Sequence, residues 1–182
     1  MKRLGMAGLS LLMVLMFSGC GGNSGEETIT VDDSSVIETH SPAEPADGET
    51  CGFCEMKVHG KGDAMGAYTG QAITADGNSV FFDDSGCLLN IQRSEDTDYA
   101  AMYVRDAETL EWIEKDDAVV VKADIQTPMK YGFSFHKDEQ SADSYIKEHS
   151  GEHAALSSWE DIDKIAEERY KKKMQHSESE GH

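Results

Sequence analysis

The chain has 182 residues and a formal net charge of −19, with 35 acidic residues against 16 lysines and arginines. A surface this acidic repels phosphate backbones, which argues against nucleic acid as a partner. Of the four cysteines, one stands at position 20, where the mature chain is expected to begin. The other three cannot all pair within the chain, which argues against a disulfide scaffold.

The N-terminus has the pattern of an export signal. Lys2 and Arg3 precede an apolar run at 9–17, which is too short for a hydrocarbon core of about 30 Å but suits a signal peptide. The ending FSGC resembles a bacterial lipobox, so we expect residues 1–19 to be removed and Cys20 to carry the acyl chains. Two or more chains anchor a protein stably without spanning the membrane. The alternative is a secretory signal cut elsewhere, which would discard Cys20.

Two polar segments flank the expected folded part. Residues 20–48 are rich in Gly, Ser, Pro and acidic side chains, and they predict a flexible linker behind the acylated cysteine. Residues 173–182 form a second polar segment, which we expect to be an unpacked tail. Between them lies one compact unit of ordinary domain size.

The first half of this unit predicts a β-β-α-β order over 49–107. Two strand-like runs flank the hairpin signal ADGNS within 64–83. A short helix carrying Cys87 follows, with Asp83, Asp84 or Ser85 as its N-cap. A further strand is expected within 98–107.

The second half repeats this order over 108–172. Strands are predicted at 116–125 and 130–138, followed by a helix that ends near Gly151. A short strand and a terminal helix, capped by Ser157 or Ser158, complete the unit. The expected class is α+β, with two related β-β-α-β units and mainly antiparallel sheet.

The stretch ETCGFCEMKVHG carries the most chemistry. If the segment is extended, Cys54 and Met56 share one face, and Cys51 lies one tight turn earlier. A thiolate beside a thioether favours Cu(I). Zinc is disfavoured, because a zinc knuckle needs a second ligand pair and only a single Cys87 is available to help.

Two other functions remain open. Cys51 and Cys54 form the CxxC spacing of a thiol–disulfide oxidoreductase, although no strand precedes it and the residues after it make a poor helix. A lipoprotein that serves only as an interaction module is the third. We find no nucleophile elbow, phosphate loop or dinucleotide fingerprint, so we do not expect an enzyme.

Two further residues are candidate ligands, and three others are not. Met129 follows Pro128 between two strands, a shaped connection that displays its thioether, and it is the candidate third sulfur. His59 is kept as an additional ligand or as a partner that orients one. Cys87 is interpreted as a small buried hydrophobe, and Asp83 and Asp84 as helix caps.

These motifs resemble a known family. CGFCEM, FFDD before a cysteine-bearing helix, AMYVRD and TPMKYGF are similar to the nitrous oxide reductase accessory proteins of the NosL family, over about residues 49–165. The resemblance implies a fold of two β-β-α-β units and a membrane-anchored lipoprotein outside the cytoplasm. It also implies delivery of Cu(I) to nitrous oxide reductase and its membrane assembly complex. By resemblance Cys54, Met56 and Met129 are the ligands, and Cys51 is a fourth candidate.

Overall fold

The computed structural model describes residues 40–95 and 97–180. The predicted signal peptide 1–19, the lipidation site Cys20 and most of the predicted linker lie outside the described residues. Within the part that is described, none of the helices combines the length and apolar character needed to cross a bilayer.

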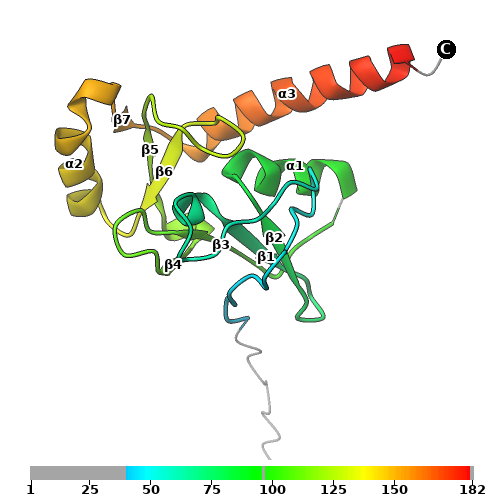
Figure 1. Cartoon of the computed structure of the whole chain (residues 1–182), viewed down its shortest axis with the longest axis horizontal. Helices are drawn as coiled ribbons and strands as arrows, with labels where there is room; N and C mark the ends of the chain where they lie inside the picture. The colour runs from blue at the N-terminus through cyan, green and yellow to red at the C-terminus, as the bar shows by residue number, and fades with distance from the viewer. Residues whose placement is uncertain (1–39, 96, 181–182) are drawn as a thin grey trace, which may run out of the picture. The chain divides into compact units, whose positions relative to one another are not determined.

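The first β-β-α-β unit builds a sheet around its first strand. Its elements are β1 (Gly70–Ile73), β2 (Ser79–Phe82), α1 (Ser85–Glu95) and β3 (Ala101–Arg105), followed by β4 (Trp112–Glu114). β1 lies between β2 and β3 and is antiparallel to both, so the sheet order is β2-β1-β3-β4 (Figure 1). The predicted hairpin is confirmed, and Gly77 takes φ 84° in its turn.

The second unit has the same topology. Its elements are β5 (Val119–Lys122), β6 (Phe133–His136), α2 (Glu139–Glu148) and β7 (Ala155–Leu156). β5 is again the central strand, antiparallel to β6 and β7. Among the described residues of the chain, 3-10 turns also occur at η1 (Gly66–Tyr68), η2 (Lys115–Asp117) and η3 (Ser150–Glu152). The predicted α+β class with antiparallel sheets is therefore confirmed.

The terminal helix α3 (Trp159–Glu180) packs against α1. Ile162 and Ala166 are fully buried, and the side-chain amide of Asn90 donates to the Ala166 carbonyl over 3.2 Å. The helix continues through 180. Residues 173–180 are therefore helical, and the prediction of an irregular tail from 173 was wrong. An i,i+4 ion pair between Lys171 and Glu167 (2.8 Å) supports these turns, and no Gly or Pro interrupts them.

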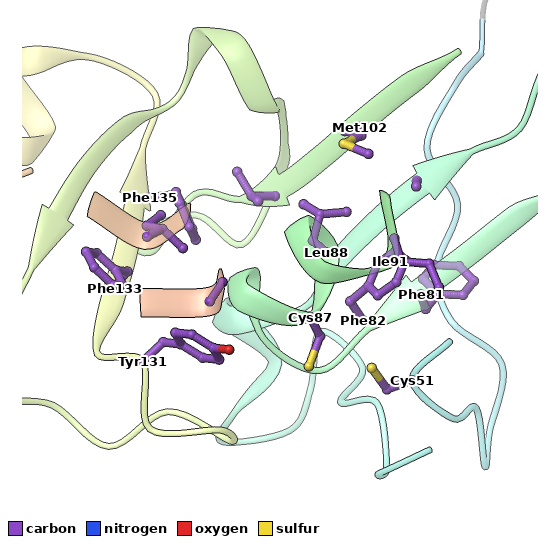
Figure 2. Close-up of a cluster of buried hydrophobic side chains, with 14 of the residues drawn as sticks. Cys51, Phe81, Phe82, Cys87, Leu88, Ile91, Met102, Tyr131, Phe133 and Phe135 are labelled. Carbon is purple, nitrogen blue, oxygen red and sulfur yellow. The ribbon is translucent and has the colours of Figure 1, made fainter. Parts of the chain in front are cut away.

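The buried side chains come from both sheets and from the inner faces of α1 and α3. Figure 2 shows Leu88 and Ile91 of α1 over Phe82, while Phe133 and Phe135 project from β6. Each such side chain contributes about 1.5–3 kcal/mol when it is fully buried. This core fixes where α1 begins, and the residues at that point form the site described below.

The folded unit begins before residue 49, which corrects the predicted boundary. The guanidinium of Arg105 in β3 is fully buried and forms two bonds to the Glu44 carboxylate, at 2.6 and 3.1 Å. The Tyr103 hydroxyl donates to the His40 carbonyl over 2.6 Å. A buried cation needs a counter-charge, so residues 40–48 lie on the first sheet instead of forming free linker.

Candidate metal centre

Residues 51–56 form a tight loop. The Cys51 N–H donates to the Met56 carbonyl over 2.8 Å, and the Glu55 N–H donates to the Cys51 carbonyl over 2.9 Å. Glu55 has φ 64°, in the left-handed region. The assumption of an extended segment was therefore wrong, and strand alternation does not place Cys54 and Met56 on one face.

Gly52 seats this loop on strand β2. Its N–H donates to the Phe81 carbonyl over 2.9 Å. A Cβ at this position would lie 2.5 Å from Cγ1 of Val80, so the close approach requires glycine. The contact holds Cys51 beside the end of β2, where α1 begins.

The start of α1 is capped by Asp84, one of the three predicted caps. Its carbonyl accepts from the Cys87 N–H over 3.0 Å, and its carboxylate accepts from the Ser85 N–H over 2.8 Å. Cys87 thus lies in the first turn. Figure 2 shows its sulfur and that of Cys51 directed toward the same space.

Four side chains meet at this point. The sulfur atoms of Cys51, Cys54 and Cys87 and a carboxylate oxygen of Asp83 all lie within 4.8 Å of one another. All three thiols are free, and the Cys54 thiol donates to Asp83 over 3.4 Å. Cys51 and Cys87 are each 2% exposed and Asp83 is 1% exposed, while Cys54 is half-buried. We call these four residues the thiol–Asp83 cluster.

Sequence reasoning missed two of its members. Cys87 is buried, as predicted, but its sulfur faces other thiols and not only apolar groups. Asp83 does not cap α1, because Asp84 does. Asp83 lies two residues before α1 begins, so no helical spacing in the sequence links it to Cys87.

The thiols of the cluster differ sharply in acidity. The pKa of Cys51 is lowered to about 7, first because the Cys87 thiol donates to its sulfur and also because the backbone N–H groups of Asp83 and Cys54 point at it. Burial raises the pKa of Cys54 to about 12. The pKa of Cys87 is raised because its proton is held by Cys51 and because it is buried. Of the three thiols, Cys51 is therefore the one that loses its proton most readily.

Met56 ends the loop with an exposed side chain, and His59, three residues later, is partly buried. The Met56 side chain is 58% exposed, and its backbone N–H points at the Cys54 sulfur. The His59 ring lies 3.4 Å from the carboxylate of Asp63, which is exposed. The predicted role of His59 beside the ligands stays a prediction.

Met129 comes to the same helix start from the second unit. Its N–H donates over 3.0 Å to the Asp84 carboxylate, which also accepts from the Thr127 hydroxyl. Burial raises the pKa of Asp84. The backbone of the predicted ligand Met129 is therefore bonded to Asp84, which follows Asp83 of the cluster in the sequence.

Helix α3 contacts both segments that carry predicted ligands. The Arg169 guanidinium donates to the Met129 carbonyl over 2.6 Å and to the Lys130 carbonyl over 3.0 Å. On the other segment, the ring of Phe53 lies 6.1 Å from that of Tyr170. The loop 51–56 and the connection 127–131 are therefore held by one helix.

The comparisons with known proteins agree with this architecture. A family model described as NosL matches residues 42–165. No curated protein matches. The crystal structure of the copper chaperone NosL from Shewanella denitrificans is similar, with 13% identity, a TM-score of 0.53 and coverage of 66% of this chain and 94% of that one. That likeness shows a shared fold, and the family match over more than half the chain shows that this protein belongs to the NosL family.

Proposed function

We propose that this chain binds Cu(I) as cargo and delivers it to an acceptor outside the cytoplasm. The observation that carries the proposal is the convergence of three free thiols at one helix start, inside the region that matches the NosL family. Soft sulfur donors favour Cu(I) over harder ions. A similar fold is found in a protein described as a copper chaperone.

The proposed ligands are Cys54, Met56 and Met129, with Cys51 as a fourth donor. Cys54 is half-buried and lies next to the exposed residues Glu55 and Met56 of the loop, so it stands at the entrance to the cluster. The Met56 thioether is exposed on the same loop, while Met129 is fixed through its backbone to α1. Thioether ligands are neutral and labile, so an acceptor's ligand is able to enter before the last donor leaves. Copper passes on without a change of oxidation state, and the chain is not an enzyme.

The acceptor and the location follow from the sequence resemblance. We propose nitrous oxide reductase, with its membrane assembly complex, as the partner that receives copper. Lipid chains on Cys20 would hold the protein at the membrane outside the cytoplasm, and the excess of acidic residues would keep the folded part away from anionic headgroups.

Titration of reduced protein with Cu(I) against a chromophoric Cu(I) chelator tests the site. Cys54→Ala should weaken binding most, because it removes the one cysteine sulfur among the three main ligands, and Met56→Leu and Met129→Leu should each weaken it less. Met102→Leu is the matched control, since Met102 is buried in β3 and the exchange keeps side-chain volume. Copper binding that is absent, or equal in all four variants, would contradict the proposal.

Delivery and anchoring need separate tests. Cu(I)-loaded protein mixed with apo-reductase, alone and with its assembly complex, should lose copper to the acceptor. No gain of copper by the acceptor would count against delivery. Cys20→Ala should move the protein from the membrane fraction to the soluble fraction of cells, and retention in the membrane would refute the lipid anchor.

A thiol–disulfide oxidoreductase using Cys51 and Cys54 is the second candidate. The low pKa of Cys51 favours it, because the thiolate is the attacking form. The 2% exposure of Cys51 disfavours it, because an incoming disulfide must reach the sulfur. Turnover of a model disulfide that persists in Met56→Leu and disappears in Cys51→Ala would favour this activity over copper delivery.

A further inference from the structure

We infer that the end of α3 carries a docking surface for an acidic face of the protein that accepts copper. Four side chains make up this surface, which we call the cationic rim: Lys130, Arg169, Lys172 and Lys173. The rim lies beside the two segments that carry the proposed copper ligands. The inference deepens the proposed delivery and rests on it, because it names the chemistry by which the acceptor is recognised.

The inner face of α3 changes character along the helix. Ile162, Ala166, Arg169 and Lys173 follow one another in steps of four, three and four residues, so they form one row. Ile162 and Ala166 are fully buried, whereas Arg169 and Lys173 are exposed. Figure 1 shows the last turns of α3 extending past α1. The row is therefore apolar where the protein covers it and cationic where it does not.

The cationic rim contacts both segments that carry proposed ligands. Arg169 donates hydrogen bonds over 2.6 and 3.0 Å to two backbone carbonyls of the connection 127–131. The Lys173 ammonium lies 5.1 Å from the centre of the Phe53 ring, in the loop 51–56. A protein that takes copper by ligand exchange must approach these two segments. It therefore also faces the rim.

The charges of the rim have no acidic partner within the described part of the chain. No carboxylate of residues 40–95 or 97–176 forms an ion pair with any of the four side chains. Lys172 and Lys173 line one depression of the surface, so their ammonium groups act together. Lys171 lies on the opposite side of the helix and is paired with Glu167 over 2.8 Å. The unpaired cations of α3 thus gather on the side of the ligand segments.

The sign of this charge is opposite to that of the protein as a whole. The chain has a net charge of −19, yet four of the seven residues from Arg169 to Gln175 are cationic and none is acidic. An acidic partner is repelled by most of such a protein and attracted to the rim. Its own charge would therefore orient it toward the copper ligands before contact.

A protein face fits the rim better than a membrane does. An anionic bilayer is a wide plane, which would also meet the acidic surface around the rim. A protein face can confine its negative charge to the area of four side chains. Residues 169–173 lie beyond residue 165, where the match to the family model ends, so the rim is a feature of this chain and not of the matched region.

The test measures association and copper transfer separately. The lipoprotein, purified in detergent and loaded with Cu(I), is presented to the acceptor proposed above, apo-reductase with its assembly complex. The double variant Lys172→Glu, Lys173→Glu should associate about 10-fold more slowly at low salt, and about 0.5 M salt should remove most of the difference. Copper transfer should slow by the same factor. Titration with the Cu(I) chelator shows whether metal binding itself has changed.

The matched control is the double variant Lys147→Glu, Lys171→Glu. It makes the same change in net charge on exposed helical residues away from the rim, so association should keep its rate to within about twofold. Thermal unfolding of both double variants shows whether they fold. If the rim variant does not fold, Lys172→Gln takes its place, with Lys171→Gln as its control, and about a twofold difference is expected.

The outcomes separate docking from delivery. Equal association of the rim variant and the control overturns this inference and leaves copper delivery standing. Association that depends on the rim, without any transfer of copper, supports the docking surface and counts against delivery. No association of the unaltered chain with the acceptor overturns the docking surface. Rim-dependent binding to phosphatidylglycerol vesicles, with unchanged association with the acceptor, would assign the rim to the membrane and overturn the inference.

Discussion

The two β-β-α-β units have one topology but different surroundings at the start of their helices. In each unit the second strand leads to an aspartate that caps the helix, Asp84 for α1 and Asp138 for α2. Asp84 is 1% exposed, whereas Asp138 lies in solvent and its carboxylate accepts from the Ser141 N–H over 2.7 Å.

The two helix starts differ in whether other segments of the chain cover them. The α1 start is covered by the loop 51–56 and by the connection 127–131, so its polar groups must find partners inside the protein. The α2 start is left to water, and its aspartate has only a capping role. An aspartate at the start of the helix therefore lies beside a candidate metal centre in the first unit and is an ordinary exposed cap in the second.

The largest effect should come from filling the covered side of α1. In Gly86→Ala the new Cβ would lie 1.9 Å from Cζ of Tyr131, so the buried ring must move. We expect a loss of at least about 3 kcal/mol in the free energy of unfolding, measured with urea. Gln140→Ala, at the same position of the exposed helix α2, should change it by less than about 0.5 kcal/mol. Equal effects would refute the contrast between the two helix starts.

Removing the buried cap Asp84 should also destabilise the protein more than removing the exposed cap Asp138, by a smaller difference than between Gly86→Ala and Gln140→Ala. Asp84→Ala leaves the Thr127 hydroxyl and the Met129 N–H without an acceptor in a buried place, at a cost of about 3 kcal/mol. Asp138→Ala should cost about 1 kcal/mol, as for an exposed cap. Asp84→Asn keeps one acceptor oxygen and should lie between these values. Urea unfolding of the three variants measures the difference, and a cheaper Asp84→Ala would contradict the role assigned to covering.

The smallest effect concerns the segment that covers the first sheet. The hydrogen bonds from Arg105 lower the pKa of Glu44 below its usual 4.5. The resulting stability is present above pH 4.5 and is lost as the pH falls through the lower pKa of the folded state. Because Glu44 is half-exposed, the contribution should be no more than about 1 kcal/mol. Glu44→Gln should flatten thermal stability over this acid range, and Asp47→Asn, an exposed neighbour, should not.

Elements with local signals could be predicted from the sequence. The turn at Gly77 needs a positive φ, and the cap at Asp84 precedes an apolar helix, so both were found by pattern. The conformation of the loop 51–56 was not, because it depends on the contact of Gly52 with Val80, 28 residues away. A single sequence shows no such distance.

The candidate site was half predicted for the same reason. The CxxC spacing is visible in the sequence, so Cys51 and Cys54 were predicted as site residues. In the sequence, Cys87 is equally well explained as a core residue and Asp83 as a helix cap. Only the folded chain shows that both lie beside Cys51 and Cys54. The counter-charge for Arg105 likewise comes from a segment whose composition resembles free linker.

The position of α3 has a consequence for shortened forms of the protein. Arg169 holds the backbone of Met129, while Tyr170 and the Lys173 ammonium (5.1 Å) lie against the ring of Phe53. A chain truncated just before Arg169 would release both segments at once, although neither is near the cut in sequence. A chain truncated just after Lys173 would keep every one of these contacts.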